Sequence, residues 1–299
     1  MHECAIIGGG PAGLNAALVL GRARRDVVVF DNNKPRNAVT HESHGFLTRD
    51  GVKPAEFRKI AHEEIAKYPS VQFRSSTVTD IRKESDGFAL VTSDGTVVRS
   101  KKVMIATGLK ETLPSVDGIH DYYGKSLFNC PYCDGWELRD RPLVVISEGS
   151  HAWGLISLVH NWSKDLIVCT NGNNNLDEQQ KAILARKNIP VYEQKIIALN
   201  GDNGLLESIV LEDRQEIKRA GGFVSPIWEQ AFTIGEALGC ETNETGSFVT
   251  DAFGRTTVQG VYAAGDSTGI APSQLVIAAG GGSRAAIGVN IDLTQEEFI

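Results

Sequence analysis

The sequence has little of what secreted, membrane-spanning or nucleic-acid-binding proteins require. Among 299 residues only 5 are cysteine, too few and too scattered for a secreted disulfide scaffold. No apolar run approaches the roughly 18 residues of a membrane span, and Met1 leads into an apolar stretch without the basic segment of a signal peptide. The net charge is −7 without a Lys/Arg-rich stripe, which argues against nucleic acid or a membrane as partner. These absences predict a cytoplasmic protein that acts on small molecules or other proteins.

The hydrophobic pattern predicts an α/β protein of about two domains, since a domain averages roughly 150 residues. Strands that alternate with helices form parallel, doubly wound sheets, and two strand–helix–strand units follow this pattern. They comprise residues 4–7, 14–23 and 26–30, and then residues 143–146, 152–162 and 166–169. Further helices are expected over 54–68, 177–186 and 273–291, further strands over 71–106 and 260–264, and linkers over 110–118 and 240–247.

A glycine-rich turn separates the first predicted strand from the first predicted helix. Its residues are Gly8, Gly9, Gly10, Pro11, Ala12 and Gly13. Small residues at this spacing let the backbone approach a pyrophosphate, whose charge is met by free N–H groups at the helix N-terminus. Asp31 ends the second strand, where a carboxylate can accept hydrogen bonds from a ribose hydroxyl. The alternative is a turn that only packs helix on strand.

Two further segments place small and polar residues directly after predicted strands. One ends in Thr107 and Gly108, and the other, far downstream, ends in Gly265 and Asp266. Together with the glycine turn, they resemble the paired signatures of flavoproteins with two dinucleotide folds. The resemblance implies that Asp266 binds the ribityl or phosphate part of FAD, although an acid after a strand can also be an ordinary turn residue.

A pair of cysteines, Cys130 and Cys133, is the only close spacing of this residue type in the chain. Such a C-x-x-C pair can close into a disulfide, and a helix start or a nearby flavin lowers the thiol pKa toward neutrality. Asp134 follows directly and could carry the proton that thiol–disulfide conversion moves. Half of a zinc site is the alternative, but it needs a second ligand pair, and the other cysteines are isolated.

With these motifs in this order, the chain resembles the low-molecular-weight thioredoxin reductase family over nearly its whole length. The resemblance implies two Rossmann-like, three-layer dinucleotide-binding domains, the second inserted into the first. The FAD domain would span residues 1–114 and 247–299, and the inserted NAD(P)H-binding-like domain would span 115–246. The resemblance also implies that Cys133 faces the flavin, Cys130 exchanges with the substrate disulfide and Asp134 acts as acid/base. A homodimer and a rotation of one domain against the other are implied as well.

Some candidate residues rest on this resemblance alone. Asn37 lies in a region that approaches the flavin in the family, as do His41 and His44, which could equally be loop histidines bound to backbone. Gln274 opens the last long helix, whose N-terminal dipole would stabilise a reduced, anionic flavin. Gln274 could also be a simple first-turn residue.

The second nucleotide site departs from the family pattern. Family members have a second glycine-rich loop, but residues 147–152 keep only Gly149 and Ala152 and add the carboxylate of Glu148. The segment that would bind the 2′-phosphate of NADPH, residues 168–173, contains no cation. Each missing charge-assisted hydrogen bond costs about 1.5 to 3 kcal/mol. We therefore expect NADPH to bind weakly or not at all.

Three explanations for this departure stay open. Electrons could come from another donor, such as a ferredoxin or a second flavin. The chain could instead use NADH, or bind NADPH through other cations such as Lys164 or Arg186. Finally, electrons could run in reverse, as in related oxidases that pass electrons from small dithiols through flavin to oxygen. Those oxidases commonly have His after the second cysteine, so Asp134 favours the reductase.

The sequence thus predicts an FAD-dependent thiol–disulfide oxidoreductase. Reduced flavin would pass two electrons to the Cys130–Cys133 disulfide, and Cys130 would then attack a disulfide of a thioredoxin-like protein. A flavin-dependent dithiol oxidase and a flavin-binding redox sensor without turnover are the alternatives.

Overall fold

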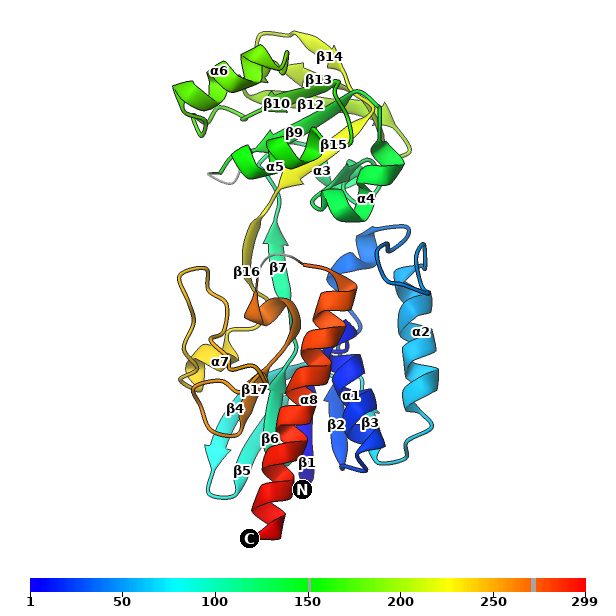
Figure 1. The fold of residues 1–299 in the computed structure, drawn as a ribbon, viewed down its shortest axis with the longest axis vertical. Helices are drawn as coiled ribbons and strands as arrows, with labels where there is room; N and C mark the ends of the chain where they lie inside the picture. The colour runs from blue at the N-terminus through cyan, green and yellow to red at the C-terminus, as the bar shows by residue number, and fades with distance from the viewer. Residues whose placement is uncertain (150–151, 270–272) are drawn as a thin grey trace. The chain divides into compact units, whose positions relative to one another are not determined.

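The computed structural model describes residues 1–149, 152–269 and 273–299. The chain forms two compact units (Figure 1). The first unit comprises Met1–Ala38, Gly45–Lys110 and Trp228–Ile299, and the second comprises Val39–His44 and Glu111–Ile227. Ser150 and His151, which belong to the degenerate nucleotide loop, lie outside the described residues. None of the helices within the described ranges is long and apolar enough to cross a membrane.

The first unit is built on one mixed sheet with the strand order β3-β2-β1-β6-β5-β4, and β17 also pairs with β6. The pairs β1–β2, β1–β6, β2–β3 and β6–β17 are parallel, whereas β4–β5 and β5–β6 are antiparallel. The strands are β1 (His2–Ile7), β2 (Val27–Phe30), β3 (Val71–Arg74), β4 (Val78–Glu84), β5 (Gly87–Thr92), β6 (Val97–Ile105) and β17 (Val261–Ala263). The parallel strands therefore end at one edge, where ligands bind in open α/β sheets.

Side chains of β1 alternate between two hydrophobic layers, as the two-residue period of a strand requires. Cys4 and Ile6 pack against α1 (Pro11–Arg22) and α8 (Leu275–Phe298), which run beside each other in Figure 1. Ala5 and Ile7 point into the layer on the opposite face. The helices α1 and α8 approach closely, because a Cβ on Gly282 would lie 2.0 Å from the carbonyl oxygen of Ala12. The remaining helices of this unit are α2 (Pro54–Ile65), α7 (Ile234–Ala237), and the 3₁₀ turns η1 (Arg36–Val39) and η2 (Gly265–Thr268).

The second unit contains a parallel sheet with the strand order β11-β10-β9-β15-β8. Helices cover one face, and an antiparallel sheet, β12-β13-β14, contributes to the core on the other, so three layers form. The strands are β8 (Leu127–Phe128), β9 (Leu143–Ser147), β10 (Leu166–Cys169), β11 (Val191–Tyr192), β12 (Ile196–Asp202), β13 (Leu205–Leu211), β14 (Glu216–Lys218) and β15 (Gly221–Ser225). The helices are α3 (Ile119–Tyr122), α4 (Pro131–Leu138), α5 (Ala152–Val159) and α6 (Glu178–Arg186). The predicted α/β class is confirmed.

The second boundary between the units differs from the expected position after residue 246. Trp228 already belongs to the first unit, because β16 (Ile227–Gln230) pairs with β7 (Leu109–Thr112) as soon as the chain leaves β15. Ile234 and Cys240 then pack in the same hydrophobic layer as Ala5. Residues 240–247 are therefore part of the first unit rather than a linker.

The C-terminal helix is also longer than predicted, running to Phe298 rather than ending near residue 291. Its last turns are held by Arg25, which donates hydrogen bonds to Thr294 and to both carboxylate oxygens of Glu297. Arg25 is far from these residues in sequence, so the end of the helix could not be predicted from the hydrophobic pattern of the helix itself.

Candidate functional site

The glycine turn lies between β1 and α1, as predicted. A Cβ on Gly8, whose φ is +114°, would lie 2.2 Å from the carbonyl oxygen of Ala106, and a Cβ on Gly13 would lie 1.9 Å from the carbonyl oxygen of Gly8. Packing alone therefore requires glycine at both positions. Gly10 is different, because a Cβ there would meet no atom of the described residues within 4 Å. Its open space suits a ligand close to the backbone.

The N-terminus of α1 can receive an anion. Gly10 is the N-cap and offers no side-chain hydrogen bond, Pro11 opens the first turn, and Ala12 and Gly13 follow it. The first N–H groups of a helix lack partners within the helix and carry partial positive charge. A phosphate is the natural ligand for such an end.

Asp31 follows β2 and lies beside this turn. A Cβ on Gly9 would be only 2.3 Å from Asp31 Oδ2. The same oxygen accepts a hydrogen bond from Arg58, and Oδ1 accepts one from the backbone N–H of Asn33 at 3.0 Å. A carboxylate has about four acceptor positions, so Asp31 can still accept a hydrogen bond from a ribose hydroxyl. Arg58 was not singled out from the sequence.

The ends of β6 and β17 add the other predicted cofactor-binding residues. Thr107 Oγ1 is buried without a hydrogen-bond partner among the described residues. The backbone N–H of Gly108 donates to Ser267 Oγ at 2.9 Å. Gly265, with φ +74°, lies where a Cβ would be 2.8 Å from the Cβ of Ala12, so this loop packs directly on the start of α1.

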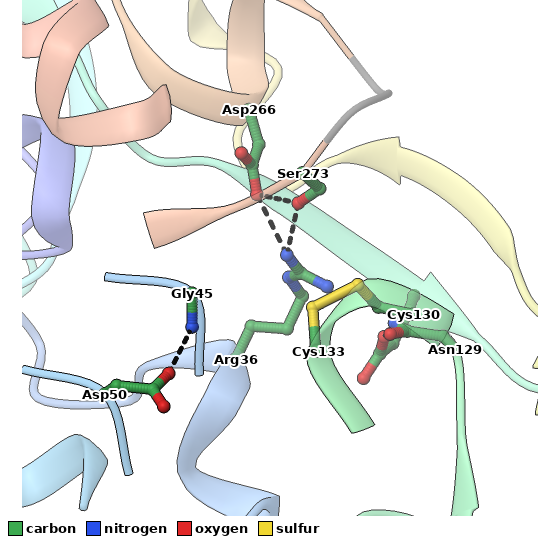
Figure 2. The surroundings of a disulfide bond; sticks show 9 residues. Arg36, Gly45, Asp50, Asn129, Cys130, Cys133, Asp266 and Ser273 are labelled. Carbon is green, nitrogen blue, oxygen red and sulfur yellow. Dashed lines mark hydrogen bonds and ion pairs between the residues drawn. A yellow bond between two sulfur atoms is a disulfide. The ribbon is translucent and has the colours of Figure 1, made fainter. Parts of the chain in front are cut away.

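Asp266 is the centre of a polar cluster in the first unit. Its Oδ2 accepts hydrogen bonds from Arg36 Nη2 at 2.9 Å and from Ser273 Oγ at 2.6 Å (Figure 2). The Arg36 guanidinium also stacks on the ring of Trp228, 4.8 Å from its centroid. Asn37 lies next to Arg36 in η1, and Gln274 is the N-cap of α8 without a side-chain capping bond.

Together these features fit FAD, the cofactor that the family resemblance implies. Three features belong to the first unit: open space beside the backbone of Gly10, a helix N-terminus without a side-chain cap, and a Thr107 hydroxyl that has no hydrogen-bond partner in the described ranges. Each would be satisfied by a dinucleotide with phosphate and hydroxyl groups.

Cys130 and Cys133 form a disulfide bond in the second unit, with Cα atoms 5.3 Å apart (Figure 2). Cys130 is the N-cap of α4, and its carbonyl accepts the N–H of Cys133 at 3.0 Å. Within the described part of the chain, no three His, Cys, Asp or Glu side chains are grouped to hold a metal ion. The remaining cysteines, Cys4, Cys169 and Cys240, are buried and free. In this structure the two sulfurs are joined to each other.

Asp134 lies in the first turn of α4, directly after this disulfide. Burial raises the pKa of its carboxyl from 3.8 to about 7; the positive charge of His44 lowers the pKa and the negative charge of Glu137 raises it. A group with a pKa near the working pH can both give and take a proton. The structure therefore places a carboxyl with a pKa near 7 directly after the disulfide in sequence.

The described start of the second dinucleotide-like turn, residues 147–149, is held by side chains of the chain itself. Glu148 follows β9, and its carboxylate accepts hydrogen bonds from Asn171 Nδ2 and from the backbone N–H of Ser115, the latter at 3.2 and 3.3 Å. Asn171 Oδ1 also accepts the N–H of Ile196 at 2.9 Å. Asn175 donates to the carbonyls of Ser147 and Gly149. A carboxylate thus lies beside the turn where a nucleotide phosphate would be expected.

The cations suggested from sequence lie elsewhere in the second unit. Lys164 binds the carbonyl of His160, just after α5, and Arg186 is exposed in the last turn of α6. Sequence reasoning missed Lys195, whose Cγ lies 3.1 Å from the position of a Cβ on Gly172. Gly172 follows β10, but Lys195 comes 23 positions later, directly before β12, and nothing local signals this contact.

Comparisons with known proteins agree with this geometry. The B. anthracis protein TrxB, classed as a thioredoxin reductase, is 49% identical, covers 99% of this chain and 100% of its own, and superposes with a TM-score of 0.96. The thioredoxin reductase aclD of Aspergillus oryzae is 31% identical over 99% of this chain and 98% of its own. A protein of Arthroderma benhamiae, also classed as a thioredoxin reductase, is 37% identical over 57% of this chain, and the match spans only 44% of that relative's length.

The model of the pyridine nucleotide-disulphide oxidoreductases matches residues 2–282. The two dinucleotide-binding folds predicted from the sequence are confirmed by the match to TrxB. The chain therefore belongs to the pyridine nucleotide-disulphide oxidoreductase family, as an oxidoreductase of the thioredoxin reductase type.

Proposed function

We propose that this protein passes electron pairs between FAD and the Cys130–Cys133 disulfide, and from there to a disulfide of a thioredoxin-like protein, with an electron donor other than NADPH. The observation that carries the proposal is the disulfide at the start of α4 followed by a carboxyl whose pKa lies near 7. That combination supplies a two-electron acceptor and a proton donor in one helical turn.

In the first unit, the residues of the glycine turn and the adjacent strand ends would hold the cofactor. The N–H groups at the start of α1 would bind the pyrophosphate, Asp31 would accept a hydrogen bond from a ribose hydroxyl, and Thr107 would supply its hydroxyl, which has no partner among the residues described. We assign Gly108, Gly265, Asp266, Asn37 and Gln274 to the same site. When bound, FAD supplies a reservoir for two electrons.

In the second unit, opening the disulfide takes up two electrons and one proton and leaves one thiol and one thiolate. We assign the flavin side of this exchange to Cys133 and the substrate side to Cys130. Asp134, neutral in part at pH 7, would give a proton to the leaving sulfur and recover it from water. The assembly would be a homodimer, a point that sedimentation would test.

Glu148 supports a donor other than NADPH, and residues 168–173 after β10 contain no cation of their own, with Lys195 as a neighbour from outside this loop. A carboxylate held by Asn171 and Ser115 adds negative charge where two phosphates would have to bind. Losing two charge-assisted hydrogen bonds, at about 1.5 to 3 kcal/mol each, weakens binding by roughly a hundred- to ten-thousand-fold. A ferredoxin or a second flavoprotein would then deliver electrons. The same observation favours a second candidate, a dithiol oxidase that returns electrons to oxygen and needs no nicotinamide.

Anaerobic mixing separates these functions. The yellow protein is mixed with NADPH, NADH, reduced ferredoxin or dithiothreitol, and the flavin absorbance is followed. Bleaching by ferredoxin and not by NADPH is the expected result, whereas rapid bleaching by NADPH would refute the proposed donor. Bleaching by dithiols alone, with peroxide formed when oxygen returns, would support the oxidase. No bleaching by any reductant would identify a redox sensor without turnover.

A further inference from the structure

A histidine from a distant part of the sequence lies against α4, the helix that carries Asp134. Residues Val39–His44 pack with the second unit, although the chain on both sides of them belongs to the first. The contact is close at Gly124, where a Cβ would lie 2.4 Å from the carbonyl oxygen of Val39. This packing brings His44 to α4, which carries Asp134.

The charges around Asp134 come from two elements. Glu137 lies on α4 itself, one turn after Asp134, and His44 comes from the 39–44 segment. His44 Nε2 is 3.8 Å from Glu137 Oε1 and 3.9 Å from Glu42 Oε2, so the imidazole lies among carboxyl groups. Its side chain is only 19% exposed. A positive charge at this place stabilises negative charge on a neighbouring carboxylate more strongly than it would in water.

We propose that His44 is a positioning residue for proton transfer by Asp134, stabilising the carboxylate that forms when Asp134 gives its proton to a cysteine sulfur. When dithiothreitol reduces the pair, the Cys130–Cys133 bond breaks and a sulfur–sulfur bond forms in dithiothreitol, which is oxidised. The leaving cysteine sulfur takes the proton of Asp134, and water then restores that proton. The inference rests on the proposed function, because it assigns Asp134 the role of acid.

His41 provides a matched comparison in the same segment. Its side chain is 79% exposed and its ion pair is with Glu42 at 3.8 Å, so it does not share the surroundings of His44. An effect of His44 on Asp134 should therefore be absent when His41 is replaced. Replacing His44 by lysine keeps a positive charge, whereas replacing it by glutamine removes the charge and keeps a polar side chain.

The test is the pH dependence of anaerobic flavin bleaching by dithiothreitol. Each rate is divided by that of Asp134→Asn at the same pH, which removes the ionisation of dithiothreitol itself. In His44→Gln the pH at which the Asp134-dependent rate falls to half should move upward by about one unit. In His44→Lys it should stay at the wild-type position or move downward, and in His41→Gln it should not move. The pKa of Asp134, followed by NMR with isotope-labelled aspartate, should change in the same order.

Coincident profiles for His44→Gln and wild type would overturn the inference. Upward shifts of equal size in His44→Gln and His44→Lys would overturn it too, because they would indicate a role of shape alone. The proposed function has a separate control, Cys130→Ser with Cys133→Ser. If dithiothreitol still bleaches the flavin of this double variant, the proposed function is wrong, independently of the results for His44. If bleaching is lost, the pH profiles of the His44 variants test the inference about His44 alone.

Discussion

Replacing Asp134 by asparagine should stabilise the second unit above neutral pH. The pKa of this carboxyl is 3.8 in its ordinary state and about 7 in the folded protein, because burial disfavours the charged form. Below pH 3.8 both states are protonated, and the carboxyl has no cost. As pH rises from 3.8 to 7, the unfolded chain ionises while the folded one stays neutral, so stability is lost progressively. Above pH 7 the loss is complete.

The size of the effect follows from the shift. One pKa unit corresponds to about 1.4 kcal/mol, so the shift from 3.8 to about 7 amounts to roughly 4 kcal/mol at most. Between pH 5 and pH 8 the advantage of Asp134→Asn over wild type should grow by about 3 kcal/mol. The Asp134 carboxyl, to which we assign the proton transfer, is therefore expected to destabilise the folded second unit.

Chemical denaturation of the oxidised protein at several pH values measures this. Tryptophan fluorescence is a suitable signal, since Trp136, Trp153 and Trp162 lie in the second unit and only Trp228 in the first. Asp140, an exposed aspartate shortly after α4, serves as the control when replaced by asparagine. A difference between Asp134→Asn and wild type that stays the same from pH 5 to pH 8 would refute the assignment of a raised pKa.

Three further substitutions test other parts of the molecule. Glu148→Gln removes a negative charge near the second dinucleotide-like turn and keeps an oxygen that can accept the hydrogen bond from the backbone N–H of Ser115. NADPH and NADH should therefore bind about fivefold more tightly in a fluorescence titration. Unchanged affinity would contradict repulsion between this carboxylate and the nucleotide phosphates. The added methyl group of Gly10→Ala meets no atom within 4 Å in the part of the chain that the structure describes, so the thermal stability of the apoprotein should stay unchanged. The affinity for FAD should fall by roughly tenfold or more, and intact FAD binding would argue against a pyrophosphate there. Tyr262→Phe removes a buried hydrogen bond to Asp292 and should cost about 1 to 2 kcal/mol in denaturation without changing the flavin spectrum; a neutral result would show that this bond adds nothing.

The local geometry of both candidate sites could be predicted from the sequence, because its signals lie within a few residues. The spacing of Gly8 and Gly13 specifies a tight turn that allows the close contacts seen between β1, α1 and β6. Two residues between Cys130 and Cys133 suffice for one helical turn to bring the sulfurs together. Asp31 and Asp266 follow buried strands, and the carboxyl ends of parallel strands share one edge of the sheet.

Only the tertiary structure decided which distant residues modify this chemistry. His44 and Asp134 are 90 positions apart, and Glu148 is held by Ser115 and Asn171 from two other loops. Residues 228–246 joined the first unit because β16 pairs with β7 and Ile234 packs on the sheet. Such contacts depend on packing between residues far apart in sequence, and no local pattern predicts them. Turns and strand ends are determined by neighbouring residues, so they could be predicted from the sequence alone.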